Sequence, residues 1–234
     1  PLVSSSAASD VYKRQQVGVS SPSSSLVKAA LINGARDLGT PDIPNAAEGW
    51  GEVNLERTVL PMDGTTPLDT FMDDKKLLSP GFGLLYSFSL DPSHGLDITL
   101  AWTDEAGSAI APQSEARLVN NLDLVLVGPD GTEWLGNDFS QGFTTTGGTA
   151  DDVNNVERIR VAPGVLPAGS ADYVLKVLHR GGTEQDFALV MSAVATPTPQ
   201  PDLAVFDGSI LSSSENPLKA VSYTHLTLPT TRLV

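Results

Sequence analysis

The sequence contains no cysteine, few aromatic and basic residues, and no long apolar run. Without cysteine the chain has no disulfide bond, no thiolate metal site and no cysteine nucleophile. Only 14 Lys and Arg stand against 28 Asp and Glu, so the net charge of -14 repels phosphate groups and anionic lipid headgroups. No apolar run approaches the roughly 20 residues that a transmembrane helix needs. We therefore expect neither nucleic acid nor a membrane as a partner.

What is present points to a β protein. The 234 residues are 40% hydrophobic and include 21 Gly and 17 Pro, which suits many short strands joined by turns around a sizeable core. Apolar residues alternate with polar or small ones over 82–90 and 96–102, the period of half-buried strands. Further strands are expected at 118–127, 132–135, 156–161, 172–178 and 186–194. With no helical pattern between them, we predict a mainly β fold, a jelly-roll-type β-sandwich.

One short helix is expected before the strands, over residues 22–36. Ser23, Ser24 and Ser25 are interpreted as residues that start and cap it. Its contact face is expected at the i, i+3, i+4 and i+7 positions Val27, Ala30, Leu31 and Gly34. A helix of about a dozen residues is marginal alone, so it must pack on something larger. In this chain we expect the segment to be loosely held, with that stripe open to water.

The two ends of the chain, residues 1–15 and 221–234, differ in composition from everything between them. Both resemble translated sequencing-adapter read-through, so we interpret them as non-native tails. The alternative is a flexible Ser-rich leader and a small C-terminal strand. The Pro/Thr-rich residues 196–201 predict an extended linker, and residues 202–220 resemble the start of a truncated Ig-like domain.

Two groups of motifs resemble one protein family. SLVKAALINGA at 25–35, followed by IPNAAEGWGEVNL at 43–55, is similar to the C-terminal end of the catalytic domain of a subtilisin-like serine protease, or subtilase, of the S8 peptidases. Residues 84–194, with LDITLAWTDEAG, LVNNLDLVLVGPDG, GND, DDVNNVERI and QDFALVMSA, resemble the β-sandwich that follows that domain in one branch of secreted alkaline subtilases. The resemblance implies a catalytic-domain end at 16–60 and an accessory β-sandwich domain at 61–195.

The resemblance also implies a function. The chain would be a fragment of a secreted, extracellular and bacterial serine endopeptidase, with its own upstream catalytic domain and a polypeptide substrate as partners. The family's Gly-Thr-Ser motif and the upstream His and Asp motifs are absent, so the fragment is predicted to be inactive. His94 and His179 are interpreted as solvated turn residues rather than general bases. The alternative is an extracellular binding or adhesion module without protease activity, although such a module has no use for the helix and its Gly-Trp-Gly turn.

Asp and Asn recur at strand ends and in the loop before residue 156. Strand ends converge at the edges of a sandwich, and Ca²⁺ takes six to eight oxygen ligands. One interpretation is therefore a structural Ca²⁺ site, and the alternative is that these side chains only form turns. A glycosidase-like carboxylate pair is a third alternative, which no spacing or sugar-stacking aromatic residue supports. The expected metal ligands are Asp104, Asn121, Asp123, Asp138, Asp151 and Asp152.

Overall fold

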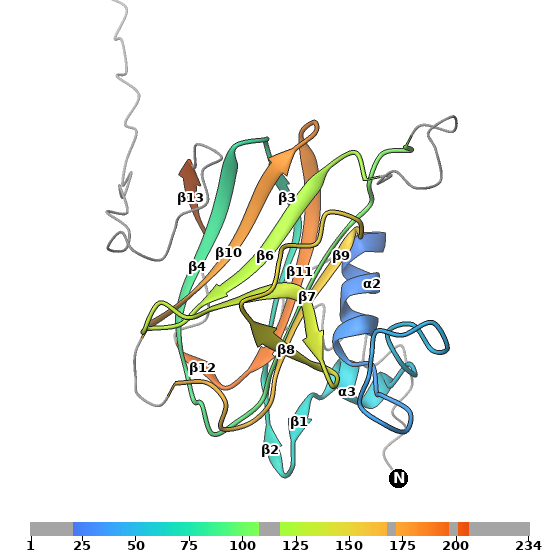
Figure 1. Cartoon of the computed structure of the whole chain (residues 1–234), viewed down its shortest axis with the longest axis vertical. Helices are drawn as coiled ribbons and strands as arrows, with labels where there is room; N and C mark the ends of the chain where they lie inside the picture. The colour runs from blue at the N-terminus through green and yellow to red at the C-terminus, as the bar shows by residue number, and fades with distance from the viewer. Residues whose placement is uncertain (1–20, 108–117, 168–171, 197–200, 206–234) are drawn as a thin grey trace, which may run out of the picture.

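The computed structural model describes residues 21–107, 118–167, 172–196 and 201–205. Two antiparallel sheets pack face to face, and one helix lies against the outside of one of them (Figure 1). The predicted mainly β sandwich with a short N-terminal helix is confirmed. The tails at 1–15 and 221–234, and most of the segment 202–220, lie outside the described residues. The expectations for them stay predictions.

The first sheet has four strands in the order β3-β11-β5-β9. They are β3 (Asp69–Leu78), β11 (Gln185–Ala193), β5 (Leu96–Trp102) and β9 (Val156–Val161). The second sheet has the order β12-β4-β10-β6-β7-β8, with β13 also paired to β4. Its strands are β4 (Phe82–Leu90), β6 (Asn121–Val127), β7 (Glu133–Ser140), β8 (Phe143–Thr146), β10 (Asp172–Gly181), β12 (Ala195–Thr196) and β13 (Pro201–Val205). A separate hairpin joins β1 (Met62–Asp63) to β2 (Thr66–Pro67).

The strand pairing is that of a jelly roll. Taken inward from the two ends of the sandwich sequence, β3 pairs with β11, β4 with β10, β5 with β9 and β6 with β7, all antiparallel. Successive pairs lie alternately in the four-stranded sheet and in the other sheet. This nesting is what results when a long antiparallel ribbon of strand pairs wraps into a double-sheet sandwich. The predicted jelly-roll type is therefore confirmed.

The main core lies between the two sheets and follows from the alternation of side chains along each strand. On β6, Leu122, Leu124 and Leu126 enter this core, while Asn121 and Asp123 occupy the opposite phase of the strand. Each large apolar side chain that is fully buried contributes about 1.5–3 kcal/mol. The largest buried core side chains include Trp102, Tyr86, Tyr173, Phe88 and Phe187.

Helix α2 (Ser24–Asn33) lies on the outer face of the four-stranded sheet, which corrects the expectation of a loosely held helix with an open stripe. Its buried apolar residues are Leu26, Ala29 and Ile32, whereas Val27 is 48% exposed. The sequence period fits two helical stripes equally well, one that begins at Val27 and one that begins at Leu26. It therefore could not decide which stripe faces the sheet. The larger buried apolar area of Leu26 and Ile32 favours the observed one.

The start of α2 agrees with the sequence. Ser23 is its N-cap, and its Oγ accepts a hydrogen bond from Leu26 N at 3.0 Å. A second short helix, α3 (Leu55–Val59), follows the Gly-Trp-Gly turn and was not predicted. No helix within the described ranges is long and apolar enough to cross a membrane.

Candidate functional site

The six predicted metal ligands do not share one environment. The carboxylate of Asp104 accepts hydrogen bonds from the backbone N–H groups of Val119 at 2.7 Å and Asn120 at 2.9 Å. Asp138 likewise accepts from Gly148 N at 3.0 Å. These bonds join residues 10 to 16 positions apart, so the two side chains connect loops rather than form local turns. The carboxylates of Asp104 and Asp138 are therefore hydrogen-bonded to backbone N–H groups of loops.

Asp151 organises the loop before β9. Its carboxylate accepts hydrogen bonds from Val153 N, from both the backbone and the side chain of Asn154, and from Asn137 Nδ2, at 2.6–3.2 Å. Asn137 in turn donates to Val156 O at 2.7 Å and accepts from Arg158 N at 2.9 Å. Strand β9 lies at the edge of its sheet, and the Asn137 side chain forms the backbone hydrogen bonds that a neighbouring strand would otherwise form. Asp152, next in the chain, is exposed.

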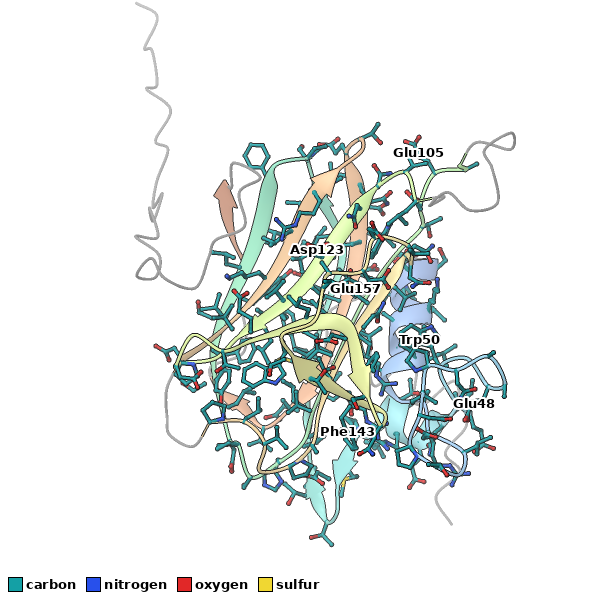
Figure 2. All side chains as sticks on the ribbon, viewed as in Figure 1. Glu48, Trp50, Glu105, Asp123, Phe143 and Glu157 are labelled. Atoms are coloured by element: carbon teal, nitrogen blue, oxygen red, sulfur yellow. The ribbon has the colours of Figure 1, made fainter. Side chains whose placement is uncertain are left out.

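Asp123 and Glu157 form a buried acidic pair between β6 and β9 (Figure 2). Asp123 is 2% exposed, and its Oδ2 accepts from Arg180 Nε at 2.5 Å. Glu157 is 1% exposed, and its Oε2 accepts from Leu124 N at 2.5 Å. Asp123 Oδ1, Glu157 Oε1 and the neighbouring Asn121 Oδ1 are buried without a hydrogen-bond partner among the described residues. Three acceptor oxygens on β6 and β9 thus lack a donor within the described part of the chain.

Local backbone geometry explains why Glu157 reaches β6. Strand β7 pairs with β6 only from Val125 to Val127, so Leu124 N has no strand partner on that side and receives the Glu157 carboxylate instead. Gly136 of β7 leaves the necessary space, because a Cβ there would collide with the Glu157 side chain. The sequence interpretation missed Glu157. The available signal was an acidic residue inside the strand pattern VERIRV.

The electrostatics of this pair favour the protonated form. Burial, followed by the charge of Asp123, raises the pKa of Glu157 well above its ordinary value. Burial also raises the pKa of Asp123, although Arg180 opposes the shift. Asp151 adds further negative charge near both groups. Of the predicted ligands, Asp123 and Asp151 therefore lie close to Glu157, and Asp152 adds negative charge near Asp123. The guanidinium of Arg180 faces both Asp123 and Glu157.

A second acidic cluster lies in the loop between α2 and α3. Asp37, Asp42 and Glu48 each offer a carboxylate oxygen, and these oxygens lie within 4.8 Å of one another, so the cluster could hold a metal ion. Asp37 Oδ1 is buried without a partner among the described residues. The loop is held by Asn45, whose Nδ2 donates to Asp42 at 2.8 Å and to Glu48 at 3.0 Å. Figure 2 shows Glu48 beside α2, away from Asp123 and Glu157.

The sequence interpretation missed this second cluster because its three acids lie in a stretch with no regular pattern. The expectation for His179 is wrong, because this side chain is fully buried, with Nε2 2.6 Å from Thr183 O. Burial lowers the pKa of His179. His94 is partly buried, with Nδ1 3.2 Å from Asp63 Oδ2.

Comparisons with known proteins relate the chain to a serine protease. No protein-family model matches the chain. Among curated proteins, it is 39% identical over 158 residues to the serine protease/ABC transporter B family protein tagA of Dictyostelium discoideum. The match covers 64% of this chain and 9% of tagA, so the chain spans about a tenth of that relative's length. The chain is therefore related to a region of a serine protease protein.

Proposed function

We propose that this chain is part of a secreted, extracellular subtilisin-like serine endopeptidase and contains its accessory jelly-roll sandwich. The observation that carries the proposal is the 39% identity to a region of tagA, whose name describes a serine protease. The jelly-roll pairing and the helix with its Gly-Trp-Gly turn agree with that assignment. The bacterial source expected from the sequence stays a prediction.

In the whole enzyme, the sandwich would contact its own catalytic domain, and the enzyme would cleave polypeptides. The chain itself is proposed to be inert, because a serine without its base stays protonated and weakly nucleophilic. The test combines casein hydrolysis with labelling by a serine-directed phosphonate, using subtilisin as the positive control. We expect neither hydrolysis nor labelling, and stoichiometric labelling of any serine would contradict the proposal. Sequencing upstream should reveal a Gly-Thr-Ser motif, and its absence would favour the adhesion module.

We further propose that the ion suited to the Asp37, Asp42 and Glu48 cluster is Ca²⁺, in a structural role. The cluster supplies only oxygen ligands, which Ca²⁺ prefers, and the unpartnered Asp37 Oδ1 is an acceptor that a cation would satisfy. A free Ca²⁺ concentration one hundred times the dissociation constant would stabilise the fold by about 2.7 kcal/mol.

The test for calcium is a thermal melt in chelator and in millimolar Ca²⁺, with Mg²⁺ as the control ion. We expect the shift in melting temperature to disappear in Asp37→Asn and to persist in Asp123→Asn. A shift lost only in Asp123→Asn would move the site to the pair of Asp123 and Glu157. No shift in the unchanged chain would contradict calcium binding at either place.

A further inference from the structure

The outer face of the four-stranded sheet is shaped to receive α2. Its apolar part consists of the small or β-branched residues Ala101, Val156, Ala188 and Val190, from β5, β9 and β11. Small side chains let a helix approach a sheet closely, and Leu26, Ala29 and Ile32 fill this surface.

A polar contact fixes the position of the helix on this surface. Asn33, in the last turn of α2, donates from Nδ2 to Ser192 Oγ at 2.9 Å and accepts at Oδ1 from Thr99 Oγ1 at 3.0 Å. Its backbone oxygen accepts from Arg158 Nη2 at 3.2 Å. One residue is thus bonded to three strands, β11, β5 and β9. The side chains of Asn33, Thr99 and Ser192 are buried, so removing the Asn33 amide would leave the Thr99 and Ser192 hydroxyls without these hydrogen bonds.

Further contacts connect other parts of residues 21–60 to the sandwich. Ser23 donates from its backbone N and from Oγ to the carboxylate of Asp74 on β3, at 3.0 and 2.5 Å. Lys28 donates to Asn155 at 3.0 Å. Helix α3 lies close to the end of α2, because a Cβ at Gly34 would be 2.7 Å from Thr58 N. The whole segment from 21 to 60, and not α2 alone, is therefore connected to the sandwich.

We infer that the outer face of the four-stranded sheet is the binding surface for residues 21–60, with Asn33 as its specificity-determining contact. The segment that resembles the end of a catalytic domain then forms one folding unit with the sandwich. A helix cannot use the same buried face on a second body, so α2 keeps only its opposite face, with Val27, for the rest of a longer protein. The inference rests on the proposed function only in naming that longer protein a protease.

The test is to cut the folded chain and measure whether the two pieces stay together. A cleavage site introduced between Gly64 and Thr65, which are exposed in the β1–β2 turn, separates the segment from the sandwich after folding. The pieces should co-elute in size-exclusion chromatography at micromolar concentration and should separate in denaturant. Separation of the pieces in native buffer would overturn the inference.

Asn33→Ala and Val27→Ala are the matched helix variants. Loss of the Asn33 hydrogen bonds should weaken the affinity of the two pieces about tenfold or more, because Thr99 and Ser192 lose their partner. Val27→Ala should leave that affinity nearly unchanged. Equal affinities in the two variants would overturn the role of Asn33. This binding test requires no protease activity, so the inference can fail while the proposed function stands, and the reverse also holds.

Discussion

Two buried polar clusters occupy the two sides of strand β9, and they differ in the sign of their charge. On the outer side, Asp97 lies 2.7 Å from Arg158 and 3.6 Å from both Arg57 and Arg160, so cations are in excess. On the inner side, Glu157 lies with Asp123 and Asp151 near the single guanidinium of Arg180, so anions are in excess.

The alternation of a strand causes this separation. Consecutive side chains point to opposite faces, so Glu157 cannot reach its neighbour Arg158 and each must find partners on other strands. The two clusters should also respond differently to pH. Arginine stays protonated throughout the accessible range, whereas a buried carboxyl group can take up a proton. A strongly acidic chain can therefore still carry one buried cluster in which cations are in excess.

The largest expected effect is on the outer side. Asp97→Ala removes the anionic partner that the described residues provide for Arg158, whose side chain is 1% exposed. Breaking a buried ion pair from one side leaves an uncompensated charge and lowers the free energy of unfolding by about 3–5 kcal/mol. Urea unfolding measures this change, with Glu52→Ala in the exposed Arg36–Glu52 pair as the control at below about 1 kcal/mol. Equal effects in the two variants would contradict the burial of this cluster.

A smaller effect is expected where β7 passes Glu157. Gly136→Ala places a Cβ against the Glu157 carboxylate and should lower the free energy of unfolding by about 1–3 kcal/mol, the usual range for overpacking. The control must be a glycine that can take a Cβ without strain. Gly64 is unsuitable because its φ is positive, whereas Gly181 has open space around a Cβ and no positive φ. Gly181→Ala should therefore be nearly neutral in the same measurement. A neutral Gly136→Ala would show that Glu157 does not lie beside β7.

The inner cluster should make stability depend on pH. The pKa of Glu157 is raised in the folded state, so the folded protein binds this proton more tightly than the unfolded chain does. The resulting stabilisation is present at or below the ordinary glutamate pKa and is lost as pH rises through the raised value. Glu157→Gln should remove this dependence and raise the free energy of unfolding near neutral pH by about 1 kcal/mol.

Unfolding free energies of the parent chain and Glu157→Gln across the acidic to neutral range provide the measurement. Taking the difference between the two chains cancels the titration of other carboxyl groups, including the exposed Asp91 and Asp130. A difference that does not change with pH would contradict the raised pKa of Glu157.

The smallest effect is expected at Asp138, a predicted metal ligand whose carboxylate accepts a hydrogen bond from loop backbone. Asp138→Asn retains an acceptor for Gly148 N and should change the free energy of unfolding by less than about 0.5 kcal/mol, as most surface substitutions do. The change should be the same in chelator and in Ca²⁺. A calcium-dependent difference would contradict this expectation and support Asp138 as a metal ligand.

Strand alternation and turn residues predicted a sandwich of short strands, but they did not predict β3, because the charged stretch DTFMDDKKLL hides the strand period. The sequence was insufficient for the helix face, where small residues in two registers give the same period. His179 follows Leu175 and Val177 on the inward phase of β10, so the same alternation could have predicted its burial. The position of Glu157 could not be predicted from sequence. Its carboxylate binds Leu124 N, which is free only because β7 stops pairing with β6 before Leu124.

Hydrogen exchange tests most directly whether residues 21–60 and the sandwich form one unit. Amides of one cooperative unit open together and exchange with the same free energy. We predict that residues 29–33 of α2 and residues 97–101 of β5 show protection factors within about tenfold of each other, converging as denaturant is added. Rapid exchange of α2 beside strong protection of β5 would contradict the account, because the helix would then open without the sheet that it covers.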